Sequence, residues 1–231
     1  MKTAGIVGGI GPESTIDYYR SIVVLYRKRR PDGSYPPVVI NSVDLQKVLG
    51  FIAAGRLDAL AAYILLALGK LAAAGADFAV LASNTPHVAF EHIAGRSPIP
   101  LISIVEAAAQ AAKASHLGRL GILGTRYTMQ GRFYPEAFWK AGVAVVPPSA
   151  DEQNAVHDIY MKELVAGVFR DSSRAQLLQV VARMRERERI DGVVLAGTEL
   201  PLLLRGHEPP GIPFLDTAKI HVERIVERLI A

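Results

Sequence analysis

Hydrophobic positions along the chain follow two alternating patterns. Short runs of β-branched and other apolar residues alternate with longer segments in which apolar residues recur every three or four positions. The short runs predict strands at Thr3–Val7, Val38–Ser42, Phe78–Ala82, Leu101–Ile104, Leu120–Leu123, Val143–Val146, Gly192–Ala196 and Phe214–Leu215. The longer segments predict helices at roughly 13–29, 57–74, 85–95, 105–115, 129–141, 151–168, 172–187 and 217–230. Parallel neighbours need crossover helices, so this alternation predicts an α/β protein with parallel sheets.

Three stretches of the first half recur in the second half. GIVGGIGPEST at 5–15 resembles GILGTRYTMQG at 121–131, DFAVLASNT at 77–85 resembles DGVVLAGTE at 191–199, and PIPLIS at 98–103 resembles GIPFLD at 211–216. The separations are 116, 114 and 113 residues, from 5 to 121, 77 to 191 and 98 to 211. We therefore expect two pseudo-symmetric lobes, each a mainly parallel sheet flanked by helices, with a cleft between them. The first lobe would hold residues 1–112 and 211–231, and the second would hold 113–210.

The composition is that of a globular protein. Half of the 231 residues are hydrophobic, 21% are charged, and the net charge is +4. The longest apolar runs, such as Ala59–Leu68, are too short to cross a bilayer. The N-terminus leads straight into a strand-like segment, so no signal peptide is expected. We predict a soluble, cytoplasmic protein without membrane association.

The one basic cluster is Arg27–Arg30, at the end of a predicted helix. Cations at a helix C-terminus complement the helix dipole, and the cluster lacks the interleaved aromatic residues of a nucleic-acid patch. No nucleic-acid partner is predicted. The chain has no cysteine, which excludes disulfides, thiolate metal sites and thiol nucleophiles. We predict no metal and no cofactor.

Polar residues gather where four predicted strands end. In parallel sheets ligands bind outside the carboxyl ends of the strands. The candidate site residues after these strands are Gly9, Ser14, Ser83, Asn84, Thr85, His87, Thr125, Thr128, Gly197, Thr198 and Glu199.

The stretch GGIGPEST at 8–15 predicts a turn with backbone N–H groups that face an anion at a helix start. It does not match a dinucleotide fingerprint, because Ser14 stands at the third glycine and no acidic residue ends a second strand about 20 residues on. A small carboxylate or phosphate is the better ligand. In the alternative, Ser14 or Thr15 is only a helix cap.

The other strand ends have similar alternatives. Asn84 and Thr85 either hold a carboxylate, with Ser83 facing the cleft, or serve as an N-cap; four adjacent polar groups exceed what a cap requires. His87 is either catalytic or an orienting, buried histidine. Thr125 and Thr128 either bind a second anionic group or cap a helix. Glu199 is either a general base or a salt-bridged cap at a helix N-terminus.

One predicted helix carries further candidates. Tyr160 or Lys162 could reach over the cleft, where Lys162 would pair with a second carboxylate of an acidic substrate. Arg126 is a candidate of the same kind. The alternative is that these charges are exposed helix residues.

Five motifs together resemble the aspartate/glutamate racemase superfamily, closest to its aspartate racemase branch, over nearly the whole chain. They are GGIGPESTIDYY at 8–19, SNTPH at 83–87, LGTRYTM at 123–129, HDIYMKEL at 157–164 and GTELPLL at 197–203. The resemblance implies two pseudo-symmetric α/β lobes around a cleft, often in a homodimer, and racemisation without pyridoxal phosphate or metal. Each lobe of such proteins supplies one cysteine, in patterns like Cys-Asn-Thr-x-His and Gly-Cys-Thr-Glu. Here those positions hold Ser83 and Gly197.

The loss of both thiols excludes the two-thiol reaction. A serine hydroxyl has a pKa several units above that of a cysteine thiol, and each unit makes ionisation about 1.4 kcal/mol more costly. Glycine has no side-chain proton to transfer. One hypothesis is an amino-acid racemase that uses other groups among Glu199, His87, Asp158 and His157. A second is a decarboxylase or lyase for a small dicarboxylate, in which a polar cradle stabilises an enediolate. A third is a non-catalytic protein that binds an amino acid or small carboxylate.

Overall fold

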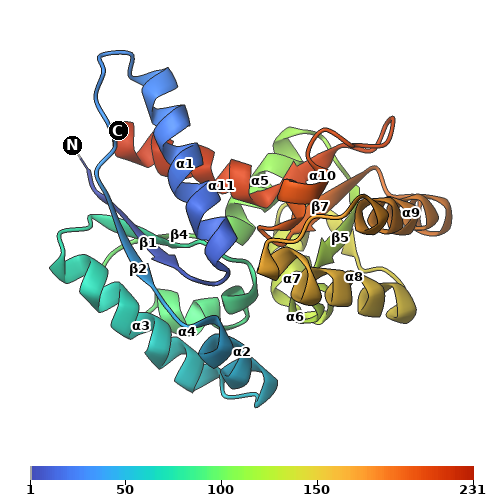
Figure 1. Cartoon of the computed structure of the whole chain (residues 1–231), viewed down its shortest axis with the longest axis horizontal. Coiled ribbons are helices and arrows are strands. Elements are labelled where there is room, and N and C mark those ends of the chain that lie inside the picture. The colour runs from blue at the N-terminus through green and yellow to red at the C-terminus, as the bar shows by residue number, and fades with distance from the viewer. Residues whose placement is uncertain (1) are drawn as a thin grey trace. The chain divides into compact units, whose positions relative to one another are not determined.

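Four parallel strands form the first sheet, in the order β2-β1-β3-β4. The computed structural model describes residues 2–231. The strands are β1 (Ala4–Gly8), β2 (Val38–Ser42), β3 (Phe78–Leu81) and β4 (Leu101–Ile102). The helical segments of this part are α1 (Pro12–Arg29), α2 (Leu45–Ala53), α3 (Leu57–Ala73), η1 (Thr85–Ala89) and α4 (Phe90–Ala94). Figure 1 shows α1 and α3 on opposite faces of this sheet, which explains why every residue of β1 and β3 is buried.

The second sheet has four parallel strands in the order β6-β5-β7-β8. The strands are β5 (Arg119–Gly124), β6 (Ala144–Val146), β7 (Gly192–Ala196) and β8 (Phe214–Asp216). The helical segments from the first sheet's end onward are α5 (Ile104–Ala114), α6 (Arg126–Gln130), α7 (Phe133–Lys140), α8 (Ala150–Lys162), η2 (Leu164–Ala166), α9 (Asp171–Glu188), α10 (Leu200–Leu204) and α11 (Thr217–Ile230).

The two sheets share one topology, as the sequence repeat predicts. In each, the first strand lies between the second and the third, and the fourth lies outside the third. The predicted α/β class, with two parallel sheets flanked by helices, is confirmed. The chain divides into one unit made of residues up to Ile104 with His221–Ala231, and another made of Val105–Ile220. The lobe limits predicted from the repeat stay a prediction.

Several predicted helices differ from those observed. The helix expected over 129–141 is two helices, α6 and α7, because the backbone at Gly131 is extended. The helix expected over 151–168 ends at Lys162, and a short η2 turn ends at Gly167 in the left-handed conformation. The segment over 85–95 starts as a 3-10 turn. Helices α2 and α10 were not predicted, although Asp44 caps α2 by accepting from the Gln46 N–H at 2.8 Å.

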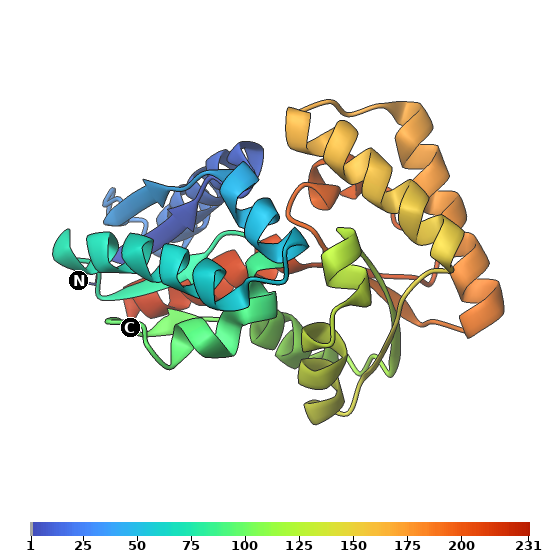
Figure 2. The ribbon, with the colours of Figure 1, turned by 90° about the horizontal axis from the view of Figure 1, so that it is seen from below.

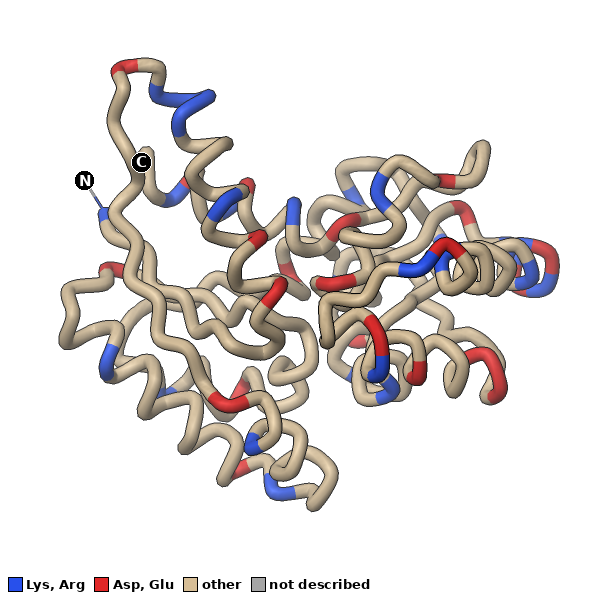
Figure 3. The backbone as a smooth tube through the Cα atoms, viewed as in Figure 1, with Lys and Arg blue, Asp and Glu red and all other residues tan. Residues whose placement is uncertain are grey.

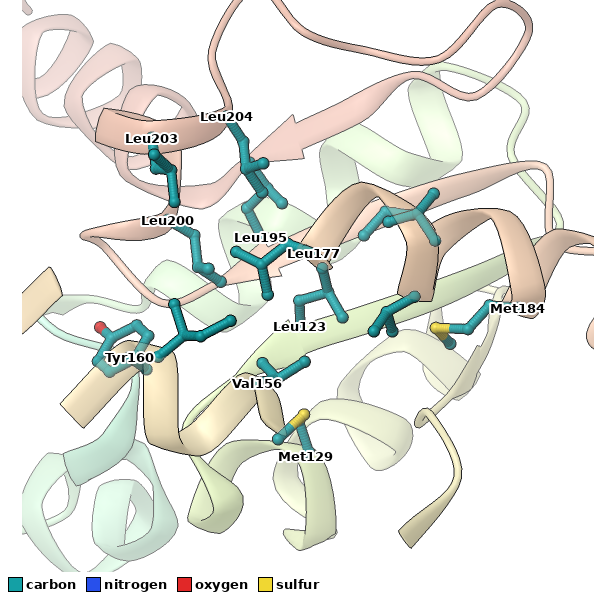
Figure 4. Close-up of a cluster of buried hydrophobic side chains, with 14 of the residues drawn as sticks. Leu123, Met129, Val156, Tyr160, Leu177, Met184, Leu195, Leu200, Leu203 and Leu204 are labelled. Carbon is teal, nitrogen blue, oxygen red and sulfur yellow. The ribbon is translucent and has the colours of Figure 1, made fainter. Parts of the chain in front are cut away.

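The core of the second unit lies between its sheet and two long helices. Figure 2 shows α8 and α9 side by side over one face of the sheet. Leu123 and Leu195 from the strands meet Val156 of α8 and Leu177 of α9, with Leu200 of α10 at the edge (Figure 4). All of these side chains are at most 1% exposed. This cluster fixes the position of α8 against β5 and β7.

Charges reinforce the same helix pair. Figure 3 shows positive and negative residues mixed along α9. Glu152 accepts from Arg183 at 2.7 Å and from Arg187 at 3.0 Å. Burial alone would raise the pKa of Glu152, but these arginine hydrogen bonds outweigh it and lower the pKa to about 2. Glu152 also completes a capping box with Ser149 at the start of α8.

The basic cluster lies at the C-terminal end of α1. Arg29 pairs with Glu227, Arg30 pairs with Asp32, and the Arg27 guanidinium lies over the Tyr35 ring. These contacts engage the cluster within the unit. Among residues 2–231, no helix is both long enough and apolar enough to span a bilayer.

A buried histidine joins three elements of the first unit. The Nε2 atom of His221, on α11, lies 2.9 Å from the Ile102 carbonyl, which can only accept, so Nε2 carries the proton. The Nδ1 atom then accepts from the Tyr18 hydroxyl of α1 at 2.9 Å. Burial lowers the pKa of His221 to about 4, which keeps the ring neutral near pH 7.

Replacing Tyr18 tests this connection. Tyr18→Phe leaves a buried imidazole acceptor without its phenol donor, so the free energy of unfolding in urea should fall by about 1–3 kcal/mol. Tyr19→Phe is the matched control, because Tyr19 is 50% exposed on the same helix and should change stability by less than about 0.5 kcal/mol. Equal stability of the two variants would contradict a structural role for the His221 hydrogen bond.

Candidate functional site

In each sheet, polar residues gather at the carboxyl ends of the two inner strands. In the first unit β1 and β3 are neighbours, with Val7 opposite Leu81, yet the chain leaves them in opposite directions, towards β2 and β4. Such a reversal opens a crevice at the carboxyl ends of the two strands. In the second unit β5 and β7 have the same relation, with Gly124 opposite Ala196. The predicted site residues follow these four strand ends.

The glycine turn after β1 is tightly packed. Gly9 has a φ of +85°, and a Cβ atom there would collide with the Val43 carbonyl and lie 2.6 Å from the Ser42 hydroxyl. The Gly9 N–H donates to the Thr15 hydroxyl at 2.8 Å, and that hydroxyl donates to the Gly11 carbonyl at 3.1 Å. Thr15 therefore accepts the Gly9 N–H within the turn, and the predicted role of Gly9 in the site stays a prediction.

The start of α1 also differs from the capping alternative. Gly11 is the N-cap and makes no side-chain capping bond, so neither Ser14 nor Thr15 is the cap residue. Ser14 is fully buried in the first turn of the helix. Thr15, which closes the turn, is the residue that sequence reasoning undervalued.

The stretch after β3 is buried throughout. Ser83, Asn84, Thr85 and His87 are between 1% and 6% exposed. Asn84 stands at the N-cap position of η1, but its side chain makes no capping bond; its carbonyl accepts from the His87 N–H at 3.0 Å. The side chain of Asn84 is therefore not the cap of η1.

His87 is a buried, neutral imidazole. It stacks on Phe90 with ring centroids 4.7 Å apart, and within residues 2–231 neither ring nitrogen has a hydrogen-bond partner. Burial, assisted by His221, lowers the pKa of His87 to about 3. Nearby backbone groups of Ser83 and Asn84 favour the charged ring, and they offset the lowering of the pKa only in part. A polar ring buried without partners is costly, which is typical of a functional position.

The strand end after β5 contains a helix cap. Thr125 is the N-cap of α6; its hydroxyl accepts from the Thr128 N–H at 3.3 Å and lies 3.1 Å from the Thr128 hydroxyl. The capping alternative therefore holds for Thr125. Both residues are at most 3% exposed.

The strand end after β7 brings Gly197 against Tyr160 of α8. A Cβ atom at residue 197 would collide with Tyr160 Cε2 and lie 3.0 Å from Cζ and 3.1 Å from the hydroxyl oxygen. The Tyr160 hydroxyl donates to Glu199 Oε2, and the Thr198 hydroxyl donates to the same oxygen at 3.2 Å. Glu199 and Thr198 are each 1% exposed. Tyr160 as the partner of Glu199 was not predicted, because no local pattern joins α8 to β7.

Glu199 occupies the N-cap position of α10 without making a side-chain capping bond. Its carboxylate binds hydroxyl groups instead. Burial raises the pKa of Tyr160 well above its usual range, and the charge of Glu199 raises it further. The phenol therefore stays protonated beside the carboxylate.

The remaining candidates lie on α8 and α6. Lys162 is exposed, and its ammonium pairs with Asp158 at 2.8 Å. His157 Nδ1 accepts from the Arg126 N–H at 3.1 Å, and the Arg126 guanidinium donates to Asn154 at 3.1 Å. Burial and the nearby Arg126 lower the pKa of His157. Lys162 is thus an exposed, paired helix charge, and its predicted contact with a substrate carboxylate stays a prediction.

One hollow of the second unit does not contain the predicted site residues. It is lined by residues of α6, α7, β6 and α8, including Met129, Trp139 and Val145, and by none from β5 or β7. Residues 2–231 contain no group of three or more side chains arranged to hold a metal ion.

Residues 7–225 match the family model of the Asp/Glu/hydantoin racemases. This match covers most of the chain, so the protein belongs to that racemase family. The chain is 25% identical over 235 residues to the broad specificity amino-acid racemase RacX of Bacillus subtilis strain 168, with 98% of each chain covered.

Solved structures show the same fold. A candidate Asp/Glu racemase from Yersinia pestis is 30% identical with a TM-score of 0.89, and 100% of each chain is covered. An aspartate racemase homologue from Pyrococcus horikoshii OT3 is 29% identical with a TM-score of 0.83, again with 100% of both chains covered. The similarity therefore extends over both units.

Substituting Gly197 tests its contact with Tyr160. Gly197→Ala should destabilise the protein by about 1–3 kcal/mol in urea unfolding, because the new methyl group overlaps the buried phenol ring. Gly69→Ala is the control, since a Cβ at Gly69 meets nothing within 4 Å. A stable Gly197→Ala protein with an unmoved Tyr160 ring would contradict the packing described.

The neutral state of His87 predicts a pH dependence. Its folded pKa, about 3, is below the unfolded value of 6.5, so the unfolded chain binds the proton first and stability falls as the pH drops from 6.5 towards 3. Between pH 7 and pH 5, His87→Gln should lose about 2 kcal/mol less unfolding free energy than the wild type. The exposed His207→Gln should follow the wild-type curve. Parallel curves for all three proteins would exclude a buried neutral His87.

Proposed function

We propose that the protein is a racemase-type isomerase of amino acids that moves the α-proton without cysteine thiols, pyridoxal phosphate or a metal ion. Membership of the Asp/Glu/hydantoin racemase family supports this reaction class. The single observation that carries the proposal is the buried carboxylate of Glu199, directly after β7, beside a glycine that has no group to transfer a proton. The absence of cysteine from the chain requires such a substitute.

Hydroxyl and amide groups at the strand ends are proposed to hold the substrate carboxylate. These are Ser83, Asn84 and Thr85 in the first unit and Thr125 and Thr198 in the second, supported by Gly9, Ser14 and Thr128. We further propose that the two sets share one cleft, as the family resemblance implies. Lys162 is proposed to contact the second carboxylate of an acidic substrate. A homodimer and a cytoplasmic location stay predictions.

The chemistry proposed is removal of the α-proton in a step for which Glu199 is the base. The electron pair left on the α-carbon moves into the substrate carboxylate as an enediolate, which hydrogen-bond donors stabilise. Ser83 and Gly197 are proposed to stand where the thiols of related enzymes would be. Ser83 then acts as a donor, since its hydroxyl is too weak an acid to form the base at neutral pH. His87 is proposed to act from the first unit, because a neutral imidazole offers one donor and one acceptor.

Proton exchange at the α-carbon tests the function. In D₂O, the wild type should replace the α-hydrogen of at least one amino acid by deuterium. Proton NMR measures this exchange for both enantiomers of acidic, neutral and basic amino acids. Glu199→Gln should slow exchange by about 100-fold or more, because amide cannot accept the proton. Glu163→Gln, a carboxylate of the same unit bound to Ser173 and Arg170, is the control and should exchange at the wild-type rate.

Other outcomes identify the alternatives. Binding of an amino acid in calorimetry without any exchange would identify a binding protein. Release of CO₂ from a small dicarboxylate, without exchange of amino-acid hydrogens, would identify a decarboxylase. Either result would overturn the isomerase proposal.

A further inference from the structure

The space at residue 197 is filled by a side chain from another element. A Cβ atom at Gly197 would lie 3.1 Å from the hydroxyl oxygen of Tyr160 and would collide with its ring. The phenol ring and its hydroxyl therefore occupy the space beside residue 197 into which a side chain there would extend. Glycine at residue 197 and tyrosine at residue 160 depend on each other, because the ring fits only when residue 197 has no side chain.

The phenol also binds Glu199. The hydroxyls of Tyr160 and Thr198 both donate to Oε2 of Glu199, and the glutamate is 1% exposed. Tyr160 is 6% exposed. Figure 4 shows the Tyr160 ring at the end of the apolar cluster, with its hydroxyl directed away from the other labelled side chains. The apolar cluster thus holds the ring of Tyr160, while its hydroxyl oxygen lies against Glu199.

We propose that Tyr160 is a catalytic residue that accepts the α-proton of the substrate and passes its own hydroxyl proton to Glu199. This inference rests on the proposed function. In the step the Cα–H bond breaks and a new O–H bond forms on Tyr160. The former phenol proton moves to Glu199 Oε2, and the electron pair of the broken bond stays on the substrate as an enediolate. Tyr160 is neutral before and after, and the negative charge moves from Glu199 to the substrate.

The transfer to Glu199 is needed because the phenol cannot ionise alone. Burial and the adjacent carboxylate hold the pKa of Tyr160 well above its usual range, so a free phenolate is excluded near pH 7. Its hydrogen bond to the Glu199 carboxylate lets the phenol lose its own proton to Glu199 while it accepts the α-proton of the substrate. The pair thereby supplies what neither group supplies separately: a phenol oxygen beside Gly197, and a carboxylate that receives the phenol proton.

The packing and hydrogen bonds of α8 support this assignment. Val156, one turn before Tyr160, and Leu164, one turn after it, are both fully buried in the same cluster. The start of the helix is fixed by the Ser149–Glu152 capping box and by the arginines of α9. A proton-transferring group needs this kind of support, because small displacements of the oxygen slow the reaction strongly.

Removing one oxygen atom tests the proposal. Tyr160→Phe keeps the ring against Gly197 and removes only the hydroxyl. With the amino acid that the wild type exchanges, we expect α-deuterium exchange to slow by about 100-fold or more, with the calorimetric Kd changed by less than about threefold. Tyr134→Phe is the matched control, as Tyr134 is a fully buried tyrosine of the same unit whose phenol interacts with Thr217. It should keep the wild-type exchange rate.

A double variant separates a relay from two independent effects. If Tyr160 and Glu199 act as one unit, Tyr160→Phe with Glu199→Gln should be no slower than the slower single variant. Wild-type exchange by a folded Tyr160→Phe protein would overturn the relay and leave the isomerase function intact. Multiplying losses in the double variant would also overturn it. A wild type that exchanges no amino acid would instead overturn the proposed function, and the relay with it.

Discussion

The parallel pairing of the first and third strands in each sheet is the constraint on which the site depends. Parallel neighbours end at the same edge, so residues 74 positions apart in the first unit, Gly8 and Ala82, follow paired residues. The same register brings Thr125 and Gly197 together in the second unit. Since the chain leaves each pair in opposite directions, no crossover helix covers the junction, and polar side chains gather there. The glycine turn, the Ser83–His87 stretch and the Glu199 carboxylate all derive their places from this arrangement.

At residue 197 a side chain from another helix occupies the space beside the glycine. A glycine weakens a strand end because it has no side chain to pack and more backbone freedom to lose. Here the ring of Tyr160 packs against it and recovers the lost contact, while the tyrosine hydroxyl binds Glu199. The arrangement couples the two sites: substitution at 197 displaces the ring, and loss of the ring leaves a cavity beside a buried carboxylate. The side chain of Tyr160 therefore both packs against Gly197 and binds Glu199.

The buried polar groups are held in different ways in the two units. In the first unit His221 is satisfied on both ring nitrogens, and His87 on neither, although both are neutral because burial disfavours the charged ring. In the second unit Glu199 is held by hydroxyl donors, and Glu152 by arginines. An arginine pair would fix a carboxylate permanently in its ionised form, as the low pKa of Glu152 shows. Glu199 instead accepts hydrogen bonds from two neutral hydroxyl groups, those of Tyr160 and Thr198.

The sequence by itself determined the α/β class, the duplicated order of strands and helices, and the strand ends at which polar residues occur. These follow from local periodicity and from a repeat that keeps its spacing, which depend only on neighbours in the chain. Two details within single segments were also present in the sequence but too weak to decide: the break at Gly131 and the Asp44 cap of α2. Only the tertiary structure decided that Thr15 uses the Gly9 N–H, that His87 lacks partners and that Tyr160 meets Gly197 and Glu199. The last of these joins residues 37 and 39 positions apart, from 160 to 197 and 199, through the packing of α8 on β7. No local pattern encodes such a contact, because it depends on how whole helices lie against a sheet.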